Sequence, residues 1–469
     1  MELLSIQDTH TAFQKGTITC TELVQYCLQN IEATGSFNLY VEVAAETAKA
    51  QAAALDEKRR KGDGYGRLAG VVFSIKDVLC WEGHPTTASS KILQGYIAPY
   101  TATVVQRLLD EDAILIGRVH CDEFAMGSSN ENSCYGPALN PIDPAYVPGG
   151  SSGASASAVA LQTCHFSIGS DTGGSVRQPA AFCGVNGYKP TYGRHSRYGL
   201  IAYASSFDQV GYLVRDVADL PVLFEISAGI DDRDATSVDA PYHWDPQSGG
   251  AAKRIAYLEV PPGLMDPEIE NAYQEVINTM KKAGMDLHGW SLSLESFLVP
   301  TYYILTTAEA SSNLSRYDGI RYGLRAAGND VETIVANTRT KGFGNEVKRR
   351  LMMGTYVLSS GYYDAYYRKA QKVRGMIIRE MDLLFQQAEA LILPVSPVMP
   401  WQVGAKLDDP VAVYYADIFT VLANLTGQPG LSLALPGSKG LFPNSIQIIG
   451  PRFADDLLFK TGLNIAQLF

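Results

Sequence analysis

The stretch from residue 140 to residue 211 limits most strongly what this chain can fold into. It is dense in glycine, serine and proline, but alanine, valine and tyrosine are interleaved with them. A flexible linker lacks apolar residues of this kind, which would hold the glycines inside a core. We therefore expect a set of tight turns within a folded domain, and not a spacer between domains.

The segments around this stretch alternate between short apolar runs and apolar residues at helical spacing. Such runs are typical of buried strands, and their alternation with helices predicts a wound α/β sheet. The expected strands are residues 71–75, which end at Lys76, and residues 113–117, 254–260 and 391–393. The expected helices are residues 19–33, with a capping box of Thr19 and Glu22, residues 103–112, and a helix with Asp266 as N-cap, Pro267 at its first position and Gly284 near its end.

The composition describes a large globular protein with an acidic balance. Of 469 residues, 46% are hydrophobic and 19% are charged, so the chain can bury a large core. A formal net charge of -11 argues against wrapping a polyanion over the whole surface. A nucleic-acid partner would therefore need another protein chain or a local patch.

Two further features of the sequence bear on localisation. The start of the chain has no basic region followed by an apolar region, and no apolar run of about 18 residues occurs. Seven cysteines are scattered without a Cys-x-x-Cys pair, which argues against structural zinc and a disulfide framework. We expect a cytoplasmic protein with reduced thiols that is neither secreted nor inserted in a membrane.

Two clusters of glycine and serine stand out, at residues 149–153 and 169–175. Glycine turns let backbone N–H groups approach a ligand closely, as in phosphate-binding loops. Neither cluster has the Gly-Lys-Ser/Thr ending of a P-loop or the spacing of a dinucleotide-binding turn, which disfavours a nucleotide site. Taken singly, each cluster is equally well explained as a simple turn.

Both clusters become informative in combination with Lys76 and with the tract at residues 175–194. In this combination the sequence resembles the amidase signature family over most of its length. The resemblance implies an α/β fold with a central mixed β-sheet covered on both faces by helices. It further implies a single domain over residues 1–469, with a core at about residues 70–215 and an insertion-like helical region at about residues 262–389.

The resemblance implies a Ser-Ser-Lys triad. Ser175 would be the nucleophile, Ser151 the bridge and Lys76 the general base, with a cis peptide bond at Gly150–Ser151. A lysine can activate a serine only when it is neutral, so burial must lower its pKa, whereas position alone suggests a solvated strand-end lysine. The implied oxyanion hole consists of the N–H groups of Thr172, Gly173, Gly174 and Ser175.

The histidines do not favour another mechanism. None of the seven shows metal-ligand spacing or a triad signature. His165 lies between the two clusters, so a Ser-His pair remains a conceivable alternative there. No metal site is expected in this chain.

Further stretches narrow the resemblance to the glutamine-hydrolysing subunits of tRNA-dependent amidotransferases. Free glutamine carries a carboxylate and an ammonium, so a selective pocket needs one fixed cation and one fixed anion. The resemblance implies Arg350, or its neighbour Arg349, for the carboxylate, Asp417 for the ammonium, and Tyr302 or Tyr303 beside the side chain. The stretches that carry it are residues 122–133, 192–209, 308–313, 342–350 and 359–367.

The same resemblance implies a reaction and partners. Such a protein supplies ammonia for converting Glu-tRNA(Gln) to Gln-tRNA(Gln), or Asp-tRNA(Asn) to Asn-tRNA(Asn). It would form a heterotrimer with the B and C subunits of the amidotransferase, and mischarged tRNA would bind mainly through the B subunit. ATP and Mg would be used by that partner, and this chain would bind no cofactor. Two alternatives stay open: a stand-alone amidase acting on another small amide, and an inert scaffold protein, against which intact Lys76, Ser151 and Ser175 argue.

Overall fold

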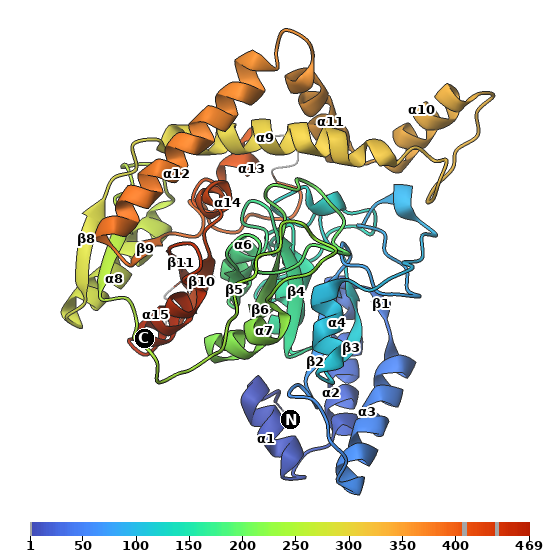
Figure 1. The fold of residues 1–469 in the computed structure, drawn as a ribbon, viewed down its shortest axis with the longest axis vertical. Coiled ribbons are helices and arrows are strands. Elements are labelled where there is room, and N and C mark those ends of the chain that lie inside the picture. The colour runs from blue at the N-terminus through green and yellow to red at the C-terminus, as the bar shows by residue number, and fades with distance from the viewer. Residues whose placement is uncertain (1, 406–409, 437–439) are drawn as a thin grey trace.

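The computed structural model describes residues 2–405, 410–436 and 440–469. Its strands are β1 Tyr40–Val43, β2 Val72–Lys76, β3 Ile114–Val119, β4 Phe166–Asp171, β5 Asn186–Lys189, β6 Gln209–Val214, β7 Arg254–Leu258, β8 Asp286–Trp290, β9 Ala390–Leu393, β10 Gly430–Leu435 and β11 Asn444–Ile449. They form one 11-stranded sheet in the order β1-β3-β2-β4-β6-β5-β10-β11-β9-β7-β8 (Figure 1). Parallel pairs join β3, β2 and β4, and also β9, β7 and β8, whereas the remaining pairs are antiparallel. The sheet is mixed, as expected.

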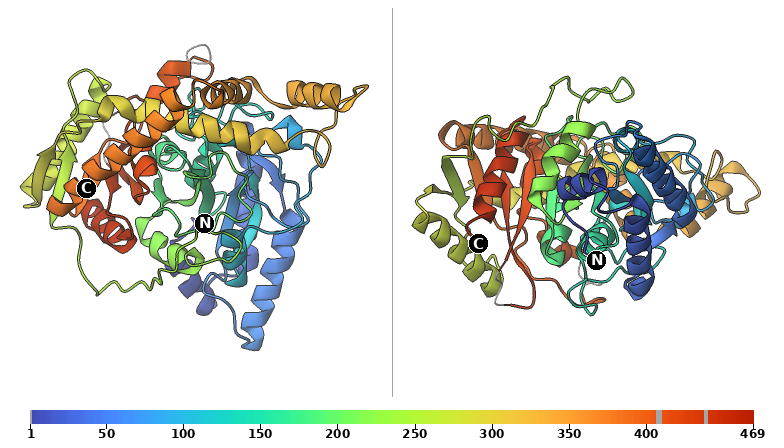
Figure 2. Two further views of the ribbon diagram at one scale, coloured as in Figure 1. Left: turned by 45° about the horizontal axis from the view of Figure 1, so that its top comes forward. Right: turned by 90° about the horizontal axis from the view of Figure 1, so that it is seen from below.

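Helices flank this sheet on both sides (Figures 1 and 2). Their bounds are α1 Ile6–Gln14, α2 Cys20–Ala33, α3 Ala45–Lys61, α4 Thr103–Asp110, α5 Gly153–Ala160, α6 Arg177–Cys183, α7 Leu220–Ser227, α8 Pro267–Lys282, α9 Leu298–Asn313, α10 Val331–Gly342, α11 Asn345–Leu358, α12 Lys369–Gln387, α13 Pro410–Tyr415, α14 Val421–Thr426 and α15 Asp455–Ala466. In the described residues, no helix is both long enough and apolar enough to cross a membrane.

The alternation of side chains along β2 explains why both faces of the sheet are covered. Phe73 and Ile75 share an apolar cluster with residues of α4 and α7, whereas Val72 shares one with residues of α2, α3 and α5. Successive side chains of a strand point to opposite faces, so a strand buried on both faces reads as a continuous apolar run. The strand before Lys76 could be recognised from the sequence for this reason.

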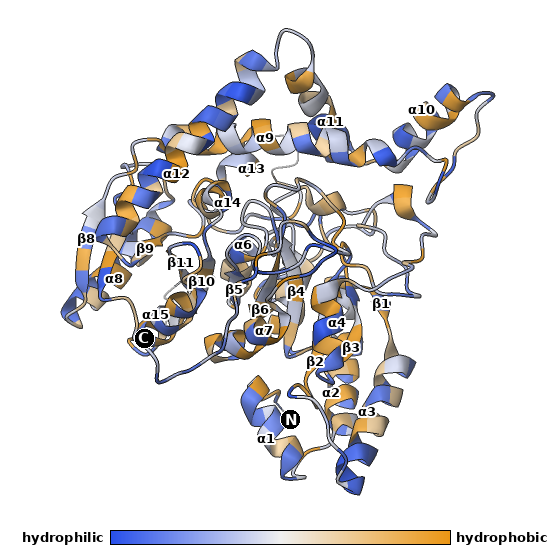
Figure 3. Cartoon of the chain, viewed as in Figure 1, coloured by the Kyte–Doolittle hydropathy of each residue, from blue (hydrophilic) through white to orange (hydrophobic). Residues whose placement is uncertain are grey.

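The expected elements are present, with small shifts at their ends. Helix α2 has the expected capping box of Thr19 and Glu22. Pro267 lies in the first turn of α8, but the side chain of Asp266 does not cap that helix, because its Oδ2 accepts a hydrogen bond from the N–H of Met399 at 2.9 Å. Hydrophobic and hydrophilic residues alternate along α8 and α12 in Figure 3, as in amphipathic helices.

The region at residues 262–389, which we expected to be helical, also contains a strand. β8 pairs in parallel with β7 at the edge of the sheet. Its sequence Asp-Leu-His-Gly-Trp has no apolar run, and all of its residues are exposed or half-buried. This strand could not be recognised from the sequence, because an edge strand in solvent lacks the pattern of a buried one.

Candidate active site

Lys76 stands at the end of β2 and is completely buried. Its Nζ lies 2.7 Å from Ser151 Oγ, 2.9 Å from Ser152 Oγ and 3.0 Å from Ser170 Oγ. Ser151 and Ser152 precede α5, whereas Ser170 lies near the end of β4. Because β2 and β4 are adjacent parallel strands, the sheet brings the lysine and both glycine–serine clusters to one edge.

Burial lowers the pKa of Lys76 to about 8, because removal from water disfavours the ammonium form. The carboxylates of Asp122, Asp171 and Asp208 act in the opposite direction. A pKa near 8 leaves a useful fraction of neutral amine close to neutral pH. This environment differs from that of a solvated strand-end lysine.

Ser175 lies in the turn between β4 and α6, next to the first cluster. It is 8% exposed, and its carbonyl oxygen accepts a hydrogen bond from the N–H of Ser152 at 3.1 Å. The Gly150–Ser151 peptide bond is cis, as expected. Within the described part of the chain, the Ser175 hydroxyl forms no hydrogen bond. The structure therefore places the three expected triad residues in one region but joins only Lys76 and Ser151 directly.

Fewer backbone N–H groups are available for the expected oxyanion hole than the sequence suggested. The N–H of Gly174 donates to Asp171 Oδ1 at 2.9 Å, so this donor is already engaged. The N–H groups of Thr172, Gly173 and Ser175 have no backbone partner among the residues that the structure describes. These three groups remain the candidate donors for a developing negative charge.

Close packing explains why this turn contains two consecutive glycines. A Cβ on Gly173 would lie 2.5 Å from the ring of Tyr302, and Gly174 has a φ of +127°. The hydroxyl of Thr420 donates to the Gly173 carbonyl oxygen at 2.7 Å. The turn before Ser175 is therefore held between α9 and the residue that precedes α14, where a larger residue would displace it.

A buried ion pair supports the turn before Ser175. Asp171 and Arg177 are fully buried, and Arg177 Nε and Nη2 donate to the two oxygens of Asp171 at 3.0 and 2.9 Å. Burial raises the pKa of Asp171, but Arg177 outweighs burial and holds the pKa below its usual range. Since Asp171 also binds the N–H of Gly174, the pair fixes the backbone next to Ser175.

Arg350, on α11, is buried among aromatic rings. Its guanidinium carbon lies 5.2 Å from the ring centre of Tyr303. Its Nε donates to Glu346 Oε1 at 2.8 Å, and its Nη1 donates to the hydroxyl of Tyr203 at 2.9 Å. The side chain of Arg349 is 43% exposed and pairs with the same glutamate. Arg350 is thus the arginine that lies beside the expected tyrosine.

Asp417 faces the same tyrosine from the other side. Its Oδ2 accepts hydrogen bonds from Ser128 Oγ at 2.7 Å and from the Tyr303 hydroxyl at 3.2 Å. Burial raises the pKa of Asp417 to about 7. The residue before Tyr303, Tyr302, adjoins Gly173. Helix α9 therefore connects the turn before Ser175 with Arg350 and Asp417.

Several polar residues of this site had no role in the expectations from the sequence. Glu346 stands four positions before Arg350 on one helix, and this spacing is the signal that could have found it. Ser152 and Ser170 lie inside the two clusters, but only the folded backbone shows that their hydroxyl groups face Lys76. The other residues without an assigned role are Ser128, Asp171, Arg177, Tyr203, Tyr414 and Thr420.

His165 takes no part in the serine clusters. Its Nδ1 accepts a hydrogen bond from the N–H of Val72 at 3.0 Å, and its Nε2 lies 3.2 Å from Thr9 Oγ1. Burial lowers the pKa of His165 to about 3. The Ser-His alternative therefore has no geometric support.

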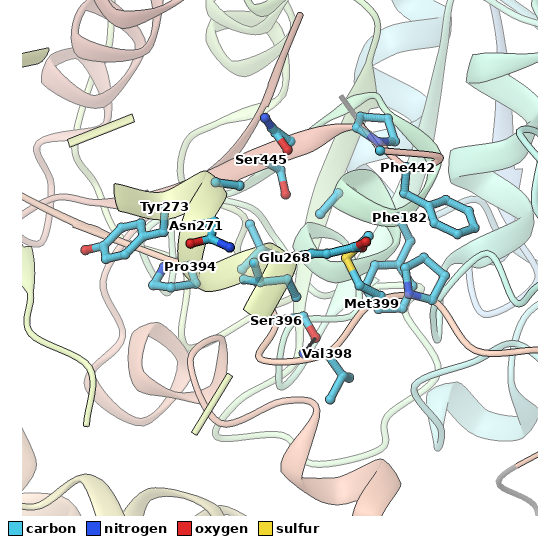
Figure 4. Close-up of a pocket in the computed structure, with 18 of the residues that line it drawn as sticks. Phe182, Glu268, Asn271, Tyr273, Pro394, Ser396, Val398, Met399, Phe442 and Ser445 are labelled. Carbon is cyan, nitrogen blue, oxygen red and sulfur yellow. Dashed lines mark hydrogen bonds between the residues drawn. The ribbon is translucent and has the colours of Figure 1, made fainter. Parts of the chain in front are cut away.

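A cavity of about 280 Å³ lies at the far end of α6 (Figure 4). Its lining includes Phe182, Glu268 and Met399, and it includes none of the expected catalytic or glutamine-binding residues. The ring of Phe182 also adjoins Gly149 of the first cluster. This cavity is separate from the candidate active site, with the side chain of Phe182 between them.

Known proteins match the chain over nearly its whole length. The Amidase family matches residues 22–459. The glutamyl-tRNA(Gln) amidotransferase A subunit from Chloroflexus aurantiacus is 46% identical over 466 residues, which cover 98% of this chain and 95% of the relative. The protein of the same name from Acidobacterium capsulatum is 45% identical over 474 residues, with 100% of both chains covered. The crystal structure of the corresponding A subunit from Thermotoga maritima has a TM-score of 0.79 at 35% identity and covers 98% of this chain and 93% of that one.

The fold and the site define an enzyme of the amidase class. A mixed sheet carries a buried lysine against two glycine–serine clusters, and the family match extends over nearly the whole chain. The chain belongs to the amidase family, and within it to the glutamyl-tRNA(Gln) amidotransferase A subunits.

Proposed function

We propose that this chain hydrolyses the side-chain amide of glutamine and supplies the ammonia to a tRNA-dependent amidotransferase. The observation that carries the proposal is the position of Lys76. This lysine is buried, its pKa is lowered to about 8, and its Nζ lies 2.7 Å from Ser151 in the cluster next to Ser175. The name of the relatives supports the amidotransferase part of the proposal.

In the proposed first step, neutral Lys76 accepts the proton of Ser151 while Ser151 accepts the proton of Ser175. Ser175 Oγ bonds to the amide carbon, and the negative charge on the carbonyl oxygen faces the N–H groups of Thr172, Gly173 and Ser175. The proton then returns to the amide nitrogen, so that ammonia leaves and a γ-glutamyl ester forms. Water, activated by the same relay, releases glutamate.

This step requires the Ser175 hydroxyl to meet Ser151 when the substrate is bound. Catalytic hydrogen bonds are often loose in the empty enzyme and tighten in the complex. The backbone contact between Ser152 and Ser175 supports the proposal, because it already holds the two turns together at 3.1 Å.

The candidate pocket has the charges that free glutamine requires. Arg350 would bind the α-carboxylate and Asp417 the α-ammonium, as charge-assisted hydrogen bonds. Tyr303 adjoins both residues, through its ring and its hydroxyl respectively. Tyr302 adjoins Gly173, so it would lie beside the side chain of glutamine on the way to Ser175.

We assign the later steps of amidation to partner proteins. The B subunit would use ATP and Mg to amidate mischarged Glu-tRNA(Gln), or Asp-tRNA(Asn), and the C subunit would complete a cytoplasmic heterotrimer. The net charge of -11 on this chain supports an arrangement in which tRNA binds mainly to the B subunit. This chain itself is proposed to need no cofactor.

The proposal is tested by glutamate release from glutamine, measured on the chain assembled with the B and C subunits. Ser175→Ala should reduce release by about 10³-fold or more, because the nucleophile is lost. Ser315→Ala, at an exposed position, is the matched control and should leave release unchanged.

The outcomes separate the alternatives. Equal release from wild type and Ser175→Ala would show that another group is the nucleophile. An assembled complex that hydrolyses a different small amide but not glutamine would favour a stand-alone amidase. Assembly without turnover of any amide would favour an inert scaffold.

A further inference from the structure

Exposed apolar side chains are concentrated where α11 and α12 meet. Of 25 large hydrophobic side chains that are exposed in the described residues, seven lie between residues 352 and 366. Surface patches rich in tyrosine and methionine are typical of protein interfaces. The seven residues are Met352, Met353, Tyr356, Leu358, Tyr362, Tyr363 and Tyr366.

Three of these tyrosines form a cluster at the tip of the hairpin that α11 and α12 form. The ring centre of Tyr356 lies 4.3 Å from that of Tyr362, and both lie 6.0 Å from that of Tyr366. Tyr366 belongs to a π-helical turn at Asp364–Arg368, a rare geometry that is frequent at functional sites. The tip projects away from the sheet at the top of Figure 1, and the three rings remain 39–47% exposed.

The hairpin is basic although the whole chain is acidic. Residues 345–387, which span α11 and α12, contain eight lysines and arginines and four aspartates and glutamates, a net charge of +4 against -11 for the chain. Lys369, Lys372 and Arg379 lie on the exposed side of α12, together with Met376. Such a surface is complementary to an apolar patch that is edged by carboxylates on another protein.

The hairpin surface adjoins the residues proposed to bind glutamine. Helix α11 buries Arg350 and exposes Met353, three residues further along. From α13, the ring of Tyr414 lies 5.4 Å from the guanidinium carbon of Arg350, and the next residue, Tyr415, is 49% exposed. A protein seated on this face would therefore lie close to Arg350 and Tyr414.

From these observations we propose that the α11–α12 hairpin is the docking surface for the protein that receives the ammonia, the B subunit. The inference rests on the proposed function, since ammonia released into water becomes ammonium and loses its nucleophilicity. The receiving protein must therefore exclude water where the amide is cut. Its matching surface is an apolar patch edged by aspartate or glutamate.

Two other occupants fit the surface less well. RNA would be attracted by the charge and by tyrosines on which bases stack, but the rings of Tyr356, Tyr362 and Tyr366 pack against one another. Met352, Met353 and Leu358 offer no contact to phosphates or base edges. A second copy of this chain would place two hairpins of net charge +4 against each other, which is unfavourable.

The first test uses the complete complex of this chain with the B and C subunits and tRNA. Tyr362 or Tyr366 is replaced by a photo-activated benzophenone amino acid, and Val331 on α10, which is 66% exposed, is the control position. We expect both tip positions to cross-link to the B subunit well above the control. Cross-links from the tip only to the C subunit, to a second copy of this chain or to tRNA would overturn the proposal.

The second test measures affinity. The double variant Tyr362→Asp with Tyr366→Asp, and separately Lys372→Glu, should weaken the association with the B subunit by about tenfold or more. Val331→Asp is the matched control and should leave affinity unchanged. All of these positions are exposed, so thermal unfolding should not shift, which separates lost docking from a lost fold.

Unchanged affinity in the tip variants would overturn the docking surface. Association is measured without turnover, so this result does not depend on glutamine hydrolysis. A wild-type complex that assembles through the hairpin but releases no glutamate would instead contradict the proposed function. The two proposals therefore fail in different experiments.

Discussion

The amine of Lys76 lies within 2.7–3.0 Å of three hydroxyl groups. Burial lowers its pKa to about 8, and a general base must be neutral, so glutamine hydrolysis should accelerate as pH rises toward 8 and level off above it. Lys76→Met should lower kcat by about 10²–10⁴-fold and remove this pH dependence. Steady-state glutamate release over a pH series measures both effects, and a wild-type profile that is flat through pH 8 would exclude Lys76 as the base.

Asp417 must be ionised to bind an ammonium group. Because burial raises its pKa to about 7, the empty pocket becomes protonated as pH falls below 7, and KM for glutamine should rise. Asp417→Asn should raise KM above pH 7, approach the wild-type KM at lower pH and abolish this dependence. The control is Tyr303→Phe, which removes one hydrogen bond of 3.2 Å but keeps the ring. A KM of the wild type that does not change between about pH 8 and pH 6 would contradict the role of Asp417.

At the scale of residues, the sequence predicts what is local in the chain. The family resemblance singled out Lys76, Ser151 and Ser175, and the structure joins the first two directly, whereas the role of Ser175 stays a prediction. The hydrogen bond from the Gly174 N–H to Asp171 depends on how one turn folds back on itself. No spacing rule contains that information.

At the scale of elements, the site depends on the close approach of α9 and α11. A Cβ on Gly354 of α11 would overlap the carbonyl oxygen of Thr307 on α9. Gly354→Ala should therefore lower the free energy of unfolding by about 1–3 kcal/mol. It should also raise KM for glutamine, because Arg350 and Tyr303 would move apart. Denaturant unfolding and steady-state kinetics measure the two effects.

Gly375→Ala on α12 is the matched control for that helix packing. Only the end of the Arg379 side chain lies near its Cβ position, at 3.7 Å. Alanine favours a helix over glycine by about 1 kcal/mol, so this variant should be as stable as wild type or more stable. A similar loss of stability in both variants would show that the contact at Gly354 is not the cause.

The elements that could be predicted are those with one dominant pattern. β2 reads as an apolar run because both of its faces are buried, and α2 is marked by its capping box. β4 is equally buried, but serine and glycine occupy half of its positions because it faces the site. β8 lies in solvent at the edge. β4 therefore lacks the apolar pattern because of its position at the site, and β8 lacks it because the strand is exposed.

At the scale of the whole molecule, the site joins segments that are far apart in the chain. Ser175 precedes α6, Arg350 lies on α11, and Asp417 follows α13. A substrate that bridges these segments holds them together in the folded state only, so it should stabilise the entire chain. Stabilisation of the fold by glutamine therefore measures glutamine binding independently of turnover.

Ser175→Ala allows this test because it should bind glutamine without hydrolysing it. Glutamine at 100 times its Kd should raise the free energy of unfolding by about 2.7 kcal/mol, seen as a higher melting temperature of the assembled complex. Asparagine has the same α-carboxylate and α-ammonium groups as glutamine but is one methylene shorter. It cannot reach Arg350, Asp417 and the turn before Ser175 at the same time, so it should stabilise the protein less. Arg350→Ala in the same background should abolish the shift. Binding energy gained at Arg350 and Asp417 must appear as a higher free energy of unfolding. If glutamine did not raise the melting temperature, or if Arg350→Ala left the rise intact, these two residues would not form the glutamine site.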